Sequence, residues 1–142
     1  MKTIASTDGT AIGVLSSGTG PGVVVIPGAT RRAHHYAKLA AALGDAYAVH
    51  AIDRRGRGPS GRQGPDYSID REVEDAIAVL DATGSAVVFG HSYGGLVALE
   101  RIIPNATLIM SPRLEHNAPD LNAPEAVAGL VRTFLTPAES MP

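Results

Sequence analysis

The sequence contains no cysteine and no tryptophan, and only two phenylalanines and four tyrosines among its 142 residues. Without cysteine, disulfide bonds and thiolate metal sites are excluded. With so few aromatic side chains, a base-stacking platform for single-stranded nucleic acid is hard to build. The core must therefore come mainly from valine, isoleucine, leucine and alanine.

The sequence also lacks an excess of either charge and any long hydrophobic run. Twelve basic and 14 acidic residues give a net charge of −2, which gives no reason to expect nucleic acid or an anionic membrane as a partner. Residues 1–8 lack the apolar run of a signal peptide, and no apolar stretch approaches the roughly 20 residues that span a bilayer. We expect a cytoplasmic protein folded as a single domain over residues 1–142.

Strand and helix patterns alternate along the chain. The expected strands are 1–4, 11–15, 22–27, 47–52, 85–89 and 107–110, and the expected helices are 33–43, 69–80, 96–103 and 124–135. Asp8-Gly9 predicts a hairpin turn between the first two strands. Strands that alternate with helices indicate an α/β fold, a three-layer sandwich whose shortened, mostly parallel sheet has helices on both faces.

The helix expected over 69–80 has the clearest periodicity. Ser68 is a plausible N-cap for it. Its apolar residues are spaced to share one face of a helix, which we expect to face the core: Ile69, Val73, Ile77 and Leu80.

The segment Gly90-His91-Ser92-Tyr93-Gly94 fits the pattern G-x-S-x-G between a buried strand and an apolar helix. The pattern describes a turn so tight that glycine is required on both sides of the serine, which then sits beneath the positive end of the next helix. The alternative is an ordinary glycine-rich turn. The flanking strand and helix favour a catalytic elbow with Ser92 as the nucleophile.

With two further segments, the elbow resembles the α/β-hydrolase superfamily. Residues 23–30 (VVVIPGAT) are similar to the family's third strand and oxyanion loop, with Pro27 where many members carry histidine. Residues 53–60 (DRRGRGPS) are similar to its D-x-R-G-x-G-x-S loop. The resemblance implies an oxyanion hole formed by the backbone amides of Ala29 and Tyr93. Taken alone, Pro27-Gly28 would be an ordinary loop.

The general base should be one of five histidines. His116 follows a predicted strand and precedes the last helix, where family members place the catalytic histidine, so the resemblance implies that it is the base. The alternative is a surface-loop histidine. His91 should flank the nucleophile, His50 should pack within its strand, and His34 and His35 could line the pocket.

The family orders its triad as serine, acid and histidine, but His116 follows Ser92 by only 24 positions. One helix and one strand fill nearly all of that interval. The resemblance therefore implies an internal deletion that removes the cap and the strand carrying the acid. Glu100 and Glu115 are expected to point away from the site. Asp120 ranks first as the acid, and the absence of any acid is an equal alternative.

The loop after Asp53 contains Gly56-x-Gly58, but no third glycine opens a helix there, so a dinucleotide site is a weak interpretation. We expect Asp53 to cap the loop and the arginines at 55 and 57 to be solvated or to bind backbone carbonyls.

These features predict hydrolysis of small carboxylic esters, with Ser92 as nucleophile and His116 as proton carrier. No metal or organic cofactor is implied. Two alternatives stay open: a non-catalytic binding module of the same fold, and a piece of a longer chain. Residues 106–110 (ATLIM) should become the sheet edge without the charge or proline that blocks edge pairing. We therefore expect a homo-oligomer joined there, in which a partner loop could supply the missing carboxylate.

Overall fold

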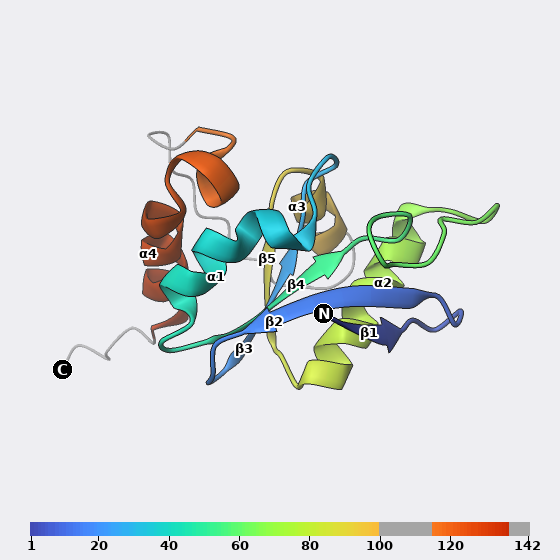
Figure 1. The fold of residues 1–142 in the computed structure, drawn as a ribbon, viewed down its shortest axis with the longest axis horizontal. Helices are drawn as coiled ribbons and strands as arrows, with labels where there is room; N and C mark the ends of the chain where they lie inside the picture. The colour runs from blue at the N-terminus through green and yellow to red at the C-terminus, as the bar shows by residue number, and fades with distance from the viewer. Residues whose placement is uncertain (100–114, 137–142) are drawn as a thin grey trace.

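A single five-stranded sheet organises the chain, for which the computed structural model describes residues 1–99 and 115–136 (Figure 1). The order is β1-β2-β4-β3-β5, with β1 Lys2–Ala5, β2 Ala11–Ser17, β3 Gly22–Ile26, β4 Ala48–Asp53 and β5 Val87–Gly90. Strand β3 runs parallel to β4 and β5, whereas β2 runs antiparallel to β1 and β4. The predicted α/β class is confirmed, and the sheet is mixed because an N-terminal hairpin extends its parallel part.

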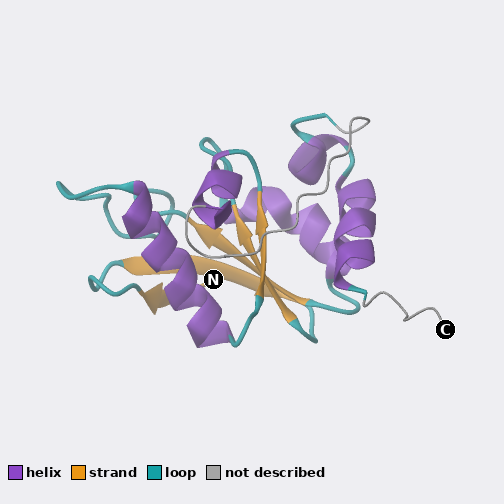
Figure 2. Cartoon of the chain, turned by 180° about the vertical axis from the view of Figure 1, so that it is seen from behind, coloured by secondary structure: helices purple, strands orange, loops and turns teal. Residues whose placement is uncertain are grey.

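Helices cover both faces of the sheet (Figure 2). The 3₁₀ helix η1 (Ala33–Tyr36), α1 (Ala37–Leu43) and α4 (Pro124–Leu135) share one apolar core with the sheet, and α2 (Ile69–Thr83) and α3 (Tyr93–Val97) share the other. Successive residues of a strand point to opposite faces, so β3 contributes Val25 to the first core and Val24 and Ile26 to the second. The predicted three-layer arrangement is confirmed.

Most expected elements lie where the sequence places them. Helix α4 has the predicted bounds. Helix α2 begins after Ser68, whose hydroxyl accepts from the Arg71 amide at 3.3 Å, and it continues to Thr83 before Gly84 ends it at φ 65°. The strand expected at 107–110, and with it the proposed oligomer edge, lies outside the described residues, as does the end of the helix expected over 96–103. Within the described ranges, no helix has the length and apolarity needed to cross a bilayer.

The apolar face expected for α2 is partly wrong. Ile77 is 38% exposed, while Val73 and Val79 are buried as core residues. Glu72 and Asp75 are also buried on this helix. The inner face of α2 is therefore a stripe of small apolar residues beside two carboxylates.

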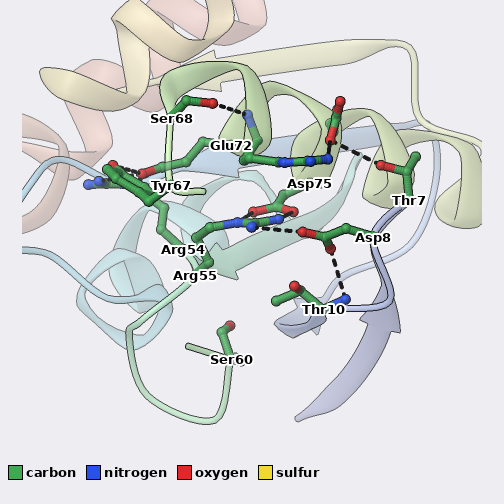
Figure 3. A network of polar contacts seen from close by, with 12 residues as sticks. Thr7, Asp8, Thr10, Arg54, Arg55, Ser60, Tyr67, Ser68, Glu72 and Asp75 are labelled. Atoms are coloured by element: carbon green, nitrogen blue, oxygen red, sulfur yellow. Dashed lines mark hydrogen bonds and ion pairs between the residues drawn. The ribbon is translucent and has the colours of Figure 1, made fainter. Parts of the chain in front are cut away.

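Those carboxylates bind two arginines from the loop after β4 (Figure 3). Arg54 binds both carboxylate oxygens of Glu72, at 2.5 and 3.0 Å, and Arg55 binds both of Asp75, at 2.8 and 2.6 Å. The expectation that Arg55 is solvated or binds carbonyls is thus wrong. A buried guanidinium requires a charged partner, and α2 provides it.

Candidate active site

The backbone of Ser92 has an unusual conformation, with φ 54° and ψ −119°. It is the single non-glycine residue with positive φ among the residues that the structure describes. Such a conformation is strained for a residue with a Cβ, and it persists only where the surroundings impose it. The chain adopts it between the end of β5 and the start of α3, which is the geometry of a nucleophile elbow.

Steric contacts explain the glycines on either side of Ser92. A Cβ on Gly90 would lie 2.5 Å from the carbonyl oxygen of Gly94, and a Cβ on Gly94 would overlap the carbonyl oxygen of Ile26. Strand β3, strand β5 and helix α3 therefore meet too closely for any other residue. The spacing in the sequence reflects this crowding.

Ser92 is exposed at a hollow of about 230 Å³ above the carboxyl ends of β3 and β5. The structure brings Ser92, His116 and Ala29 together around this hollow, although the described residues include no hydrogen bond between the serine and the histidine. The full lining consists of Gly28, Ala29, Thr30, Arg31, His91, Ser92, His116 and Asn117.

The loop after β3 lies directly against Ser92. A Cβ on Gly28 would be 3.3 Å from the Cβ of Ser92. The Gly28 amide donates to the hydroxyl of Tyr36 at 3.2 Å. Among the turn and loop hydrogen bonds of the described residues, none is donated by the amides of Ala29 or Tyr93. The Tyr93 amide opens α3, where the first amides of a helix have no partner within it.

His91 joins the loop after β3, through Tyr36, to the loop that carries His116. It is 6% exposed, its Nδ1 lies 2.7 Å from the Tyr36 hydroxyl, and its Nε2 lies 2.6 Å from the main-chain carbonyl oxygen of His116. Because a carbonyl only accepts, Nε2 carries the proton, and Nδ1 accepts from the Tyr36 hydroxyl. That hydroxyl in turn accepts from the Gly28 amide. The sequence motif contains no signal for this link, which depends on η1 lying beside the elbow.

Burial shifts both titratable groups in the link. It lowers the pKa of His91, which favours the neutral ring that this pattern requires. It also raises the pKa of Tyr36 to about 12, so the phenol keeps the proton that it donates. The chain of hydrogen bonds is therefore intact at neutral pH.

Asp120 has a fully buried carboxylate that forms an ion pair with the guanidinium of Arg31. Arg31 also donates to the side chain of Asn117 at 3.3 Å. The described residues include no hydrogen bond from His116 to Asp120, so its role as triad acid stays a prediction. Glu115 is exposed and accepts from the side chain of Asn122 at 2.7 Å. Glu100 lies outside the described residues.

The other histidines are engaged elsewhere in the fold. His50 lies on β4, 2.8 Å from the Ser16 hydroxyl, and the Nδ1 of His35 accepts from the Arg32 amide at 2.9 Å. Neither these residues nor His34 is part of the lining of the hollow beside Ser92. Within residues 1–99 and 115–136, no group of three or more histidine, aspartate or glutamate side chains is placed to hold a metal ion.

Asp53 has a structural place behind the site. Its buried carboxylate accepts from the Ala33 amide at 2.8 Å and pairs with Arg32 at 3.2 Å. It therefore holds the start of η1, the helix that carries Tyr36. Arg57 is exposed and donates to the carbonyl oxygen of Ala29 at 3.0 Å, as expected for an arginine that binds the backbone.

Comparison with known proteins gives a consistent match. The model of the alpha/beta hydrolase family matches residues 23–141. An alpha/beta hydrolase from Sphaerobacter thermophilus superposes with a TM-score of 0.66 at 44% identity, over 70% of this chain and 38% of that one. An esterase from Exiguobacterium antarcticum gives 0.65 at 26% identity, over 71% and 39%.

A 2-heptyl-3-hydroxy-4-quinolone dioxygenase of Rhodococcus erythropolis is 29% identical over 91 residues, which are 63% of this chain and 33% of that protein. The chain thus matches only about a third to two fifths of the length of these proteins.

Proposed function

Because the chain belongs to the alpha/beta hydrolase family, we propose that it acts as a serine hydrolase on small carboxylic esters. The observation that carries this proposal is the strained backbone of Ser92, at φ 54° in a tight turn that opens onto a hollow shared with His116. Strain of this kind costs about 1–3 kcal/mol and is concentrated at active sites. A serine nucleophile presented at the turn would account for it.

In the proposed reaction, Ser92 Oγ attacks the acyl carbon while His116 accepts its proton. The amides of Ala29 and Tyr93 donate to the oxygen that becomes negative. The C–O bond to the alcohol then breaks, and His116 returns the proton to the departing alcohol. Water hydrolyses the acyl-serine in the same way, with His116 again accepting and returning a proton.

The site supports a small substrate. The volume of the hollow, about 230 Å³, is smaller than the 300–1,000 Å³ of a typical pocket for a drug-sized ligand. The similar proteins include both an esterase and a dioxygenase, so the family alone does not select the reaction. The serine hydroxyl at the elbow favours acyl transfer. Cytoplasmic location, self-association and independence from cofactors stay predictions from the sequence.

Labelling with a fluorophosphonate probe tests the proposal. Ser92 Oγ should form a bond to phosphorus with loss of fluoride, and mass spectrometry of the digested protein should find the adduct on the peptide containing Ser92. Ser92→Ala should carry no adduct. Equal labelling of both proteins would contradict the assignment of the nucleophile.

Cleavage of p-nitrophenyl acetate tests the base. We expect slow turnover, because a triad without its acid loses about 10⁴-fold in rate in the best-studied protease. The rate should fall further in His116→Ala, because that variant also lacks the base. If His116→Ala keeps the full rate while Ser92→Ala loses it, another base is at work.

One observation favours a second function, a binding module that has lost catalysis. Among the described residues, no carboxylate accepts a hydrogen bond from the ring of His116. A folded wild-type protein that reacts neither with the fluorophosphonate nor with p-nitrophenyl acetate would support that alternative.

A further inference from the structure

We propose that Arg54 is a positioning residue that orients both backbone donors of the oxyanion hole. The proposal rests on the function proposed above, and it adds a residue outside the expected triad and oxyanion loop. Arg54 comes from the loop after β4, yet it reaches the oxyanion loop and the first residue of α3. It thereby joins the two segments that carry Ala29 and Tyr93.

The first contact sets the peptide between Gly28 and Ala29. Arg54 Nη1 donates to the carbonyl oxygen of Gly28 at 3.3 Å, and the amide of Arg31 donates to the same oxygen at 3.1 Å. This peptide is planar and trans, so its C=O and N–H point in opposite directions. With the carbonyl directed at Arg54, the amide of Ala29 is directed away from it. Hydrogen bonds to a carbonyl also polarise the peptide and make its N–H a stronger donor.

The second contact sets Tyr93. The guanidinium carbon of Arg54 lies 4.3 Å from the centroid of the Tyr93 ring, within cation–π distance. The hydroxyl of Tyr93 lies 3.3 Å from that of Tyr67, which itself hydrogen-bonds to Glu72. The ring and the hydroxyl of Tyr93 are thus both in contact, which restrains the residue whose amide opens α3.

Arg54 can orient Gly28 and Tyr93 because its own side chain is immobilised. Only 5% of its side chain is exposed, and Glu72 binds it through two parallel hydrogen bonds (Figure 3). Burial alone would lower the pKa of Arg54, but the hydrogen bonds and the charge of Glu72, together with Tyr67, outweigh it and raise that pKa. The pair is neutral as a whole, so its effect on the site is one of orientation.

Arg55 provides a matched control from the next position in the chain. Its guanidinium is equally buried and binds Asp75 through two hydrogen bonds, with a third to Asp8. Its described contacts include neither Gly28 nor Tyr93. Loss of this pair removes similar buried charge without touching the proposed oxyanion hole.

The test compares two double variants. Arg54→Met with Glu72→Gln removes one pair, and Arg55→Met with Asp75→Asn removes the other, so that neither leaves a deeply buried ion alone. The readouts are the second-order rate constant of fluorophosphonate labelling, and kcat and KM for p-nitrophenyl acetate, in variants shown by thermal unfolding to be folded. Loss of a whole oxyanion donor costs about 10²–10³ in kcat. We expect misorientation at Arg54 to cost about 10- to 100-fold in labelling rate and kcat with little change in KM, and the Arg55 pair to stay within about threefold of wild type.

If the Arg54 double variant does not fold, Arg54→Lys serves instead, because one ammonium cannot reproduce the planar fork that binds Glu72 and Gly28 together. The labelling rate constant and kcat of this variant should fall by about 10-fold. Equal losses at both pairs, or wild-type rates at Arg54, would overturn the proposal while a labelled wild type leaves Ser92 as nucleophile. A folded wild type that takes no label would instead overturn the proposed function, and this inference with it.

Discussion

His91 holds the main chain of His116: its Nε2 donates to the carbonyl oxygen of that residue at 2.6 Å, and the two rings lie 5.0 Å apart. The residue beside the proposed nucleophile thus anchors the loop of the proposed base. Its other nitrogen accepts from Tyr36, so both ring nitrogens are occupied in the neutral form. A proton added to Nδ1 would turn that acceptor into a donor and break the pattern.

This arrangement predicts a pH dependence of stability. The pKa of His91 lies below its ordinary 6.5 in the folded protein because the ring is buried, so the unfolded chain binds the proton more readily. The free energy of unfolding should therefore be highest above pH 6.5 and fall as the pH drops towards the folded-state pKa, by no more than about 1.4 kcal/mol per pH unit for this group.

His91→Gln, which cannot titrate, is the variant that isolates this effect. Urea unfolding between pH 7.5 and about 5 should show a smaller loss for the variant than for wild type. Burial also lowers the pKa values of His35 and His50, but both residues remain in the two proteins and cancel in the difference. Parallel stability curves would contradict the assignment.

The backbone strain at Ser92 predicts that a glycine variant is more stable than an alanine variant, which is the reverse of the usual order. Ser92→Ala and Ser92→Gly both remove the hydroxyl, and glycine within regular structure is normally less stable than alanine by about 0.5–1 kcal/mol. At φ 54° and ψ −119°, however, glycine is free of the strain that a Cβ creates. We expect Ser92→Gly to be the more stable of the two by about 1 kcal/mol in urea unfolding. A more stable Ser92→Ala would show that the turn is relaxed.

The sequence predicted best where local chemistry decides the structure. Helix α4 begins at Pro124, a residue suited to the first turn, and its bounds match the prediction. The elbow was recognisable because Gly90, Ser92 and Gly94 lie within five consecutive positions, although the atom that crowds Gly94 belongs to Ile26 in β3. Both signals lie next to the residues that they position, so spacing along the chain was enough to find them.

Prediction failed where the partners lie far apart in sequence. Arg55 and Asp75 are 20 positions apart, and each resembles a solvated surface residue when read alone. Both are buried, whereas Ile77, which periodicity places in the core, is exposed. The link from His91 through Tyr36, 55 positions away, was equally hidden. Such contacts depend on the tertiary packing of η1 and α2, which no local pattern encodes.

The buried pair of Arg55 and Asp75 predicts a strong coupling. Asp75→Leu removes two of the hydrogen bonds of a guanidinium that is only 2% exposed and leaves Asp8 as its remaining acidic partner. Loss of the whole partner of a buried ion costs about 3–5 kcal/mol, so we expect a loss near the lower end of that range. Adding Arg55→Met to that variant should recover most of the loss, because an apolar pair of similar volume replaces an ionic one. A double-mutant cycle by urea unfolding measures the coupling. Additive losses would mean that the pair does not form in solution.

The last prediction separates two neighbouring glycines of α3. In a helix, alanine is favoured over glycine by about 1 kcal/mol, and Gly95 has room for it, since the nearest atom to an added Cβ is 3.5 Å away. Gly95→Ala should therefore be as stable as wild type or slightly more so. Gly94 has the same helical preference, but its Cβ would overlap the carbonyl oxygen of Ile26 in β3, which main-chain atoms cannot relieve without moving the elbow. Gly94→Ala should lose several kcal/mol, about the range of severe core overpacking or more, and should also lose fluorophosphonate labelling. Thermal unfolding and labelling of the two variants side by side decide the matter, because similar behaviour of both would show that strand β3 does not press against the turn at Gly94.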